Sequence, residues 1–145
     1  MIVRPAGIWV VDGQVLTMRY QYSGRDRFNL PGGNQEFGEE IKAGLVREFA
    51  EELGVVVEVG DLLWTAETLV AGREVLHLLF KVESMVGSPL LNPDETKALE
   101  LVWLNPEEVV KVPLYPAIGS CLKPWLKENK KSATYLGCIN QDWIA

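Results

Sequence analysis

Apolar residues occur mostly in short runs along the chain, a pattern typical of a protein rich in β-strands. The runs 6–11 and 14–20 flank the pair Asp12-Gly13, and such a pair between two apolar runs is a strong hairpin signal. Further strands are predicted at 28–30, 55–59, 61–70, 73–83 and 98–104, with an extra strand at 133–139, a tight turn at 71–72 and loops at 21–27 and 84–97.

One segment has the period of a helix instead. Apolar side chains recur every four residues at Ile41, Leu45, Phe49 and Leu53. This spacing predicts an amphipathic helix over 39–53, and Gly54 is expected to end it in the left-handed conformation. A second helix is predicted around 115–129, where Pro124 would kink or split it.

These elements favour the α+β class. Strands dominate, with one helix early in the chain and one late, which indicates a mixed sheet with helices packed on both faces. The hairpin signals imply antiparallel pairs and argue against a purely parallel sheet. A chain of 145 residues fits a single domain over 1–145.

Composition and charge narrow the class of partners. The net charge is −6 and no stripe of Lys or Arg is present, which argues against binding of polymeric nucleic acid. No long apolar run or signal peptide is recognisable, so no membrane contact is expected. The two cysteines, Cys121 and Cys138, lack metal-type spacing, which favours a reducing, cytoplasmic location.

The first predicted helix gathers carboxylates on one side. Glu48, Glu51 and Glu52 are spaced at i, i+3 and i+4 near its C-terminus, where their charges repel one another and oppose the helix dipole. Hard divalent cations prefer carboxylate oxygens and would remove this conflict. Gly32 and Gly33 precede the helix and allow the backbone to approach a metal ion or a phosphate closely. The pattern therefore indicates a site for metal and phosphate.

The stretch 33–55, GNQEFGEEIKAGLVREFAEELGV, matches at every position the Nudix box GX5EX7REUXEEXGU, in which U is apolar. The preceding Leu30-Pro31-Gly32 fits the usual lead-in. The chain therefore resembles the Nudix hydrolases, which include MutT-like proteins. The resemblance implies the Nudix fold, an α/β/α sandwich with a mixed central sheet. It also implies hydrolysis of a diphosphate linkage in a nucleoside diphosphate derivative by metal-activated water, with Mg²⁺ or Mn²⁺ as cofactor.

The resemblance also implies roles for individual residues. It implies that Glu48 and Glu52 are the principal metal ligands. Glu51 is a further ligand, directly or through water, and the carbonyl of Gly32 can join them. Glu39 and Arg47 are expected to support these ligands, with Arg47 pairing with carboxylates and orienting them rather than touching substrate.

The base that deprotonates the attacking water lies outside the box in many family members. In related proteins an acidic residue of the loop that corresponds to 92–97 often faces the metal ions, and this makes Glu95 the candidate base. Glu48 is the competing candidate for the same role.

The sequence is less explicit about the substrate. Arg19 and Arg27 are candidates for binding terminal phosphates, and Phe28 is a candidate for stacking on a base. The proline and tyrosine that mark ADP-ribose and dinucleoside polyphosphate subgroups are absent from 69–72. A nucleoside triphosphate or a nucleotide sugar is therefore expected. His77, the one histidine, lies among apolar neighbours and is expected to be structural.

Two other functions stay open. The chain could be a non-catalytic Nudix module that senses a nucleotide, although such modules usually have eroded boxes and this box is intact. Isomerase chemistry on an isoprenoid diphosphate would need cysteine or histidine machinery that the sequence does not show. The expected partner is a small nucleotide, and the sequence permits a homodimer, which is frequent among similar proteins.

Overall fold

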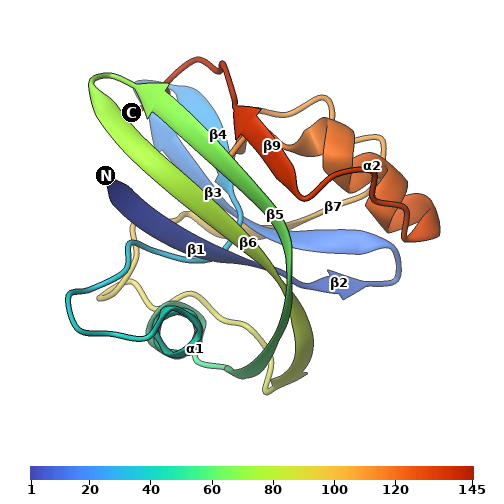
Figure 1. The fold of residues 1–145 in the computed structure, drawn as a ribbon. Coiled ribbons are helices and arrows are strands. Elements are labelled where there is room, and N and C mark those ends of the chain that lie inside the picture. The colour runs from blue at the N-terminus through green and yellow to red at the C-terminus, as the bar shows by residue number, and fades with distance from the viewer.

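Two mixed β-sheets form the centre of the molecule (Figure 1). The structure is a computed structural model that describes residues 1–145. The first sheet has the order β1-β6-β5-β9, with β1 (Ile2–Ile8), β6 (Arg73–Val86), β5 (Val56–Val70) and β9 (Tyr135–Cys138). The second contains β2 (Val10–Val11), β3 (Gln14–Tyr22), β4 (Arg25–Asn29) and β8 (Leu114–Tyr115), with β7 (Glu100–Leu104) paired to β3. Each sheet combines parallel and antiparallel pairs, as expected for the α+β class.

Three hairpin turns share one conformation, in which both central residues have positive φ: Asp12-Gly13, Ser23-Gly24 and Ala71-Gly72. The first and third confirm the predicted turns. The prediction of a loop over 21–27 is wrong, because β3 continues to Tyr22 and β4 begins at Arg25. This end of the hairpin is largely exposed, so its strands carry polar side chains and lack the apolar alternation that identifies a strand.

Other strand boundaries also differ from the prediction. β5 is one strand rather than two, and the expected break near Gly60 is a bulged stretch with shifts of register between Glu58 and Trp64. β6 continues to Val86, so the following loop is shorter than expected. The extra strand predicted near the C-terminus is present as β9, which pairs in parallel with β5.

α1 (Ile41–Leu53) covers one face of the strands. Gly54 ends it at φ 66°, which confirms the predicted left-handed cap. The helix begins two residues later than predicted, because Glu39 lies in the preceding loop. Its apolar side packs against strand residues in one buried cluster of Leu16, Met18, Leu45, Phe49, Leu53, Val55, Val57, Phe80 and Val82.

α2 (Gly119–Glu128) lies on the opposite side of the strands from α1 (Figure 1). Pro124 lies inside this helix and does not split it, although the helix starts later than the predicted 115. Trp125 meets the buried Trp64 edge to face, with 5.9 Å between ring centroids. A second buried cluster of twelve residues forms here. The two clusters confirm that helices pack on both faces.

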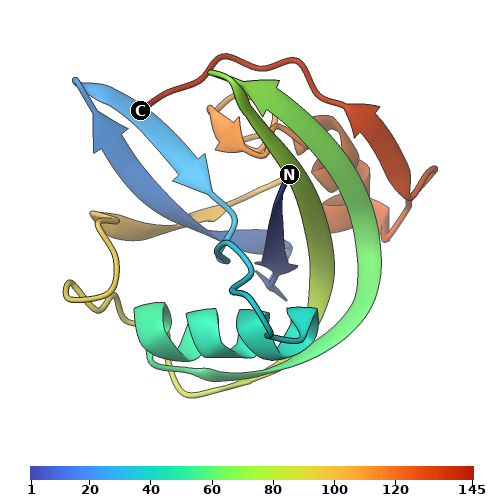
Figure 2. The ribbon, with the colours of Figure 1, turned by 60° about the vertical axis from the view of Figure 1, so that its left-hand side comes forward.

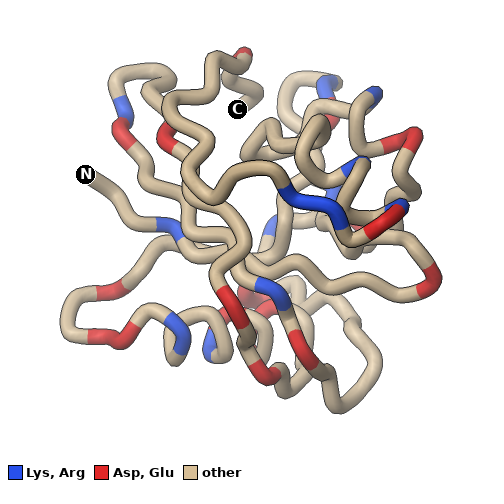
Figure 3. Tube along the Cα trace, turned by 45° about the vertical axis from the view of Figure 1, so that its right-hand side comes forward, with Lys and Arg blue, Asp and Glu red and all other residues tan.

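Charged residues are distributed over the whole trace. Figure 3 shows Lys and Arg positions interspersed with Asp and Glu, without a continuous basic stripe. No helix is both long and apolar enough to cross a membrane.

Gly7→Ala should destabilise the fold by about 1–3 kcal/mol, because a methyl group at this position would overpack the core. A Cβ there would lie 2.8 Å from the ring of Phe49 and from Cγ2 of Val82. Chemical denaturation measures the loss. The double variant Gly7→Ala, Phe49→Leu should lose less stability than the sum of the two single changes, and strict additivity would contradict the proposed clash.

Candidate active site

The glycine loop that follows β4 runs antiparallel to β1. Gly7 N–H donates to Pro31 O at 2.8 Å, and Gly33 N–H donates to Pro5 O at 3.2 Å. A Cβ on Gly32 would collide with the Pro5 carbonyl, and one on Gly33 would collide with the carboxylate of Glu48. The two glycines therefore allow one loop to contact both β1 and the acidic side of α1.

Arg47 organises the carboxylates on α1. Its Nε and Nη2 donate to the two oxygens of Glu39 at 2.7 and 3.1 Å, and its Nη1 donates to Glu51 at 2.9 Å. Nη2 also lies 3.2 Å from Oε1 of Glu48. The hydrogen bonds from Arg47 hold the pKa of Glu39 below its ordinary value. Arg47 therefore joins Glu39 in the loop to Glu48 and Glu51 on the helix.

Gly44 makes this arrangement sterically possible. It lies one turn before Glu48, and a Cβ at this position would occupy the space of the Glu39 carboxylate. The loop carboxylate can therefore lie directly on the helix and reach Arg47. Glu39 contributes its side chain from the loop, two residues before the first residue of α1.

Glu48 and Glu52 are the two carboxylates of α1 whose pKa is raised. Burial raises the pKa of Glu48, although the charge of Arg47 opposes the shift. Burial, together with the negative charges of Glu48, Glu51 and Glu95, raises the pKa of Glu52 to about 7, and Arg4 only partly offsets this effect. An unliganded Glu52 is therefore easily protonated near neutral pH.

The donor set suits a hard divalent cation in chemical type, because it consists of carboxylate and carbonyl oxygens. No three acidic, histidine or cysteine side chains are grouped closely enough to hold an ion without movement. Glu51 and Glu48 are both directed to Arg47 in this arrangement. A cation would therefore have to compete with Arg47 for these carboxylates.

The loop between β6 and β7 docks on the C-terminal end of α1 (Figure 2). Leu90 N–H donates to Leu53 O at 3.0 Å, and Asn92 N–H donates to Glu52 O at 2.9 Å. These bonds satisfy helix-terminal carbonyls that have no partner within the helix. They also bring Glu95, an exposed residue of the loop, near enough to Glu52 to affect its pKa.

The three candidate substrate residues do not converge. Arg19 pairs with Glu100 at 2.7 Å and with Asp26 at 3.2 Å. Phe28 is partly buried and packs against the cluster under α2. Arg27 lies among four aromatic rings, with its Cζ 4.8–5.6 Å from the ring centroids of Tyr20, Tyr22, Tyr115 and Trp143.

Arg4, whose charge acts on Glu48 and Glu52, and its neighbour Tyr115 were not singled out from the sequence. Arg4 on β1 is 7% exposed and contacts the face of Tyr115, with 5.3 Å from Cζ to the ring centroid. A charged residue within the apolar run 2–8 was the available signal for Arg4. No comparable signal pointed to Tyr115, because β8 has only two residues and so shows no strand periodicity. His77 is fully buried and bonds Thr68 at 2.9 Å, as expected for a structural histidine.

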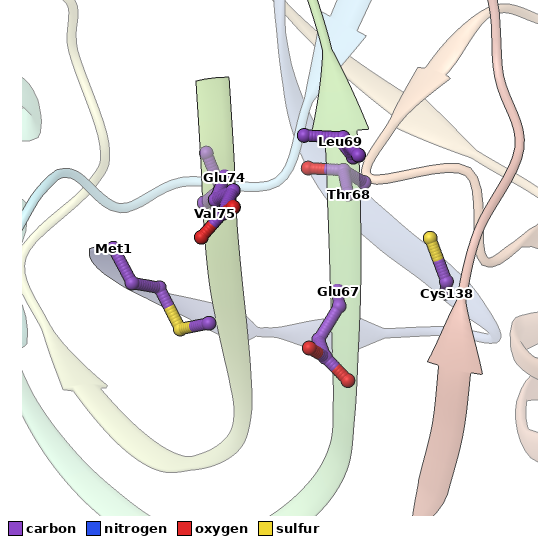
Figure 4. A pocket seen from close by; sticks show the side chains of 7 residues that line it. All are labelled: Met1, Glu67, Thr68, Leu69, Glu74, Val75 and Cys138. Atoms are coloured by element: carbon purple, nitrogen blue, oxygen red, sulfur yellow. The ribbon is translucent and has the colours of Figure 1, made fainter. Parts of the chain in front are cut away.

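Figure 4 shows a separate hollow of about 230 Å³, and none of its lining residues belongs to α1. It is lined by Met1, Glu67, Thr68, Leu69, Glu74, Val75 and Cys138. Its two carboxylates and its thiol come from β5, β6 and β9, and they do not form a metal-binding group. The hollow therefore adds nothing to the chemistry of the α1 site.

Comparisons with known proteins point to one family. A family model described as NUDIX domain matches residues 1–126. CTP pyrophosphohydrolase of Escherichia coli (strain K12) is 35% identical over 120 residues, which cover 81% of this chain and 85% of that protein. A MutT-like protein of Streptomyces ambofaciens is 32% identical over 108 residues, covering 74% of this chain and 66% of that protein. The solution structure of the E. coli ORF135 protein matches with a TM-score of 0.75 at 28% identity, covering 92% and 95% of the two chains.

Glu52→Gln should make the metal-free protein more stable at pH 8 and leave its stability unchanged at pH 4. The pKa of Glu52 is about 7 in the folded protein and near 4.5 in the unfolded chain. The stabilisation that comes from the protonated form is therefore complete below pH 4.5 and is lost as pH rises through 7. Glutamine avoids this loss, and partial solvation limits the gain to about 1 kcal/mol.

The measurement is denaturant unfolding in the presence of a chelator at both pH values. Glu58→Gln is the control, since Glu58 is exposed on β5. It should show no such pH dependence. A Glu52→Gln protein that is less stable than wild type at pH 8 would contradict the electrostatic account.

Proposed function

Because the chain belongs to the NUDIX family and is a hydrolase of that family, we propose that it hydrolyses the diphosphate linkage of a nucleoside triphosphate. The observation that carries this proposal is the group of half-buried carboxylates on α1, held against the glycine loop and oriented by Arg47. Similarity to CTP pyrophosphohydrolase, the 35% identical relative, supports a triphosphate over a nucleotide sugar. The intact box favours catalysis over nucleotide sensing.

Glu48 and Glu52 would hold a magnesium or manganese ion, with Glu51 and the Gly32 carbonyl as further ligands. A bound divalent cation neutralises phosphate oxygens and makes water more acidic. The chain supplies the geometry. Arg47 fixes the direction of the Glu48 and Glu51 carboxylates, and Gly33 lets the glycine loop lie directly against Glu48.

Glu95 is the proposed base. It accepts a proton from the attacking water while the water oxygen bonds to phosphorus and the diphosphate oxygen leaves. Its loop is fixed by the bonds to Leu53 O and Glu52 O and by a contact between Thr96 Oγ1 and Tyr20 OH at 3.1 Å. The loop therefore holds an exposed carboxylate beside the acidic end of α1. Glu48 is the alternative base.

Glu52→Gln should lower kcat for pyrophosphate release at least about 100-fold, because it removes an anionic ligand and its charge. The assay follows pyrophosphate and phosphate with magnesium or manganese over nucleoside triphosphates, ADP-ribose and nucleotide sugars. A chelator should abolish turnover, and Glu58→Gln should retain it within about twofold. A wild-type protein that turns over none of these compounds would favour the sensing module.

Glu95→Gln should lower kcat more than about tenfold with little change in KM, because the side chain acts on the water rather than on substrate binding. Asp94→Asn is the matched control on the same loop, and it should behave like wild type. Equal rates in Glu95→Gln and wild type would assign the base to Glu48.

A further inference from the structure

Arg4 combines burial with an incomplete set of hydrogen bonds. Its side chain is only 7% exposed, and its Nη2 donates to Leu30 O at 3.2 Å. Its Nη1 is buried as well and has no hydrogen-bond partner in the protein. Guanidinium remains protonated in proteins, so the unused donor also carries charge into the interior. Burial lowers the pKa of Arg4, which shows that this position disfavours the cation.

The unpaired atom is not isolated. His77 is the register partner of Arg4 across β1 and β6, and its Nδ1 is buried without a partner too. These are the two such side-chain atoms in the structure. Both residues contact the ring of Tyr115, Arg4 over its face and His77 at 5.1 Å between centroids. The two buried side-chain nitrogens without a hydrogen-bond partner therefore belong to residues that both contact Tyr115 of β8.

Arg4 lies next to the glycine loop of the candidate active site. The carbonyls on either side of Arg4 hold the glycine loop, since Val3 O accepts from Gln35 N–H at 2.8 Å and Pro5 O accepts from Gly33 N–H. The charge of Arg4 acts on both Glu48 and Glu52. No ion pair joins Arg4 to Glu48 or Glu52, and the arginine paired with Glu48 is Arg47.

Arg4 also contacts an aromatic ring, that of Tyr115, which belongs to a larger group of rings. Tyr115 separates it from Arg27, which lies over the rings of Tyr20, Tyr22 and Trp143. Tyr20 and Tyr22 are parallel, at 6.3 Å between centroids. Arg4 thus stands between carboxylates suited to a metal-bound phosphate chain and a group of rings suited to the nucleoside.

We propose that Arg4 is a substrate-binding residue, whose free Nη1 donates a hydrogen bond to an oxygen on the nucleoside side of the scissile linkage. The acceptor is either an α-phosphate oxygen or a carbonyl oxygen of the base, and a guanidinium donor suits both. This inference rests on the proposed nucleotide hydrolysis. It explains why a cation is retained in an apolar strand.

The test compares Arg4→Met with wild type in kcat/KM for CTP, UTP, ATP and GTP. Loss of a charged hydrogen bond should lower kcat/KM about tenfold or more, mainly through KM. An equal loss for the four nucleotides identifies a phosphate acceptor, and a loss that depends on the base identifies a base carbonyl. Arg25→Met, which removes an exposed arginine of β4, should leave kcat/KM unchanged.

Arg4→Lys keeps the charge and should recover part of the loss, and it also serves if Arg4→Met does not fold. Calorimetric binding of CMP in the presence of a chelator gives a readout that needs no turnover. Weaker CMP binding by either Arg4 variant supports the proposal even if the wild type fails to hydrolyse triphosphates, which would refute the proposed function alone. Folded variants with wild-type KM and CMP affinity would overturn the role of Arg4 and leave the hydrolase assignment intact.

Discussion

The antiparallel contact between the glycine loop and β1 is the constraint on which the rest of the site depends. It places Gly33 against the Glu48 carboxylate and fixes where the chain enters α1. It also flanks Arg4 with the two carbonyls that hold the loop. A side chain at Gly32 would break this contact, because the backbones of loop and strand approach too closely for a Cβ.

Stability and function conflict on α1. Carboxylates near the C-terminus of a helix oppose its dipole, and their burial raises the pKa of Glu48 and Glu52. Arg47 limits the conflict by pairing with Glu39, Glu48 and Glu51, which offsets part of their negative charge. Glu52 has no comparable partner, since Arg4 acts on it only at longer range. The proposed divalent cation would offset the remaining repulsion between these carboxylates, since such ions prefer carboxylate oxygen.

The docked loop between β6 and β7 connects helix stability with the placement of Glu95. Its backbone N–H groups satisfy carbonyls at the end of α1, and the same contacts keep an acidic side chain near Glu52. Tyr20 holds the loop from the other side through Thr96. One set of hydrogen bonds therefore joins α1, β3 and the loop around the proposed reaction centre.

Features that rest on local spacing could be predicted from the sequence. The four-residue period and Gly54 specified α1 and its end, Asp12-Gly13 specified a hairpin, and the fixed register of the box specified the carboxylate group. The contacts between distant residues are visible only in the folded chain. Arg19 is paired with Glu100 across β3 and β7, and Arg4 lies unpaired beside Tyr115. Such contacts depend on strand register and burial, which neighbouring residues in the sequence do not encode.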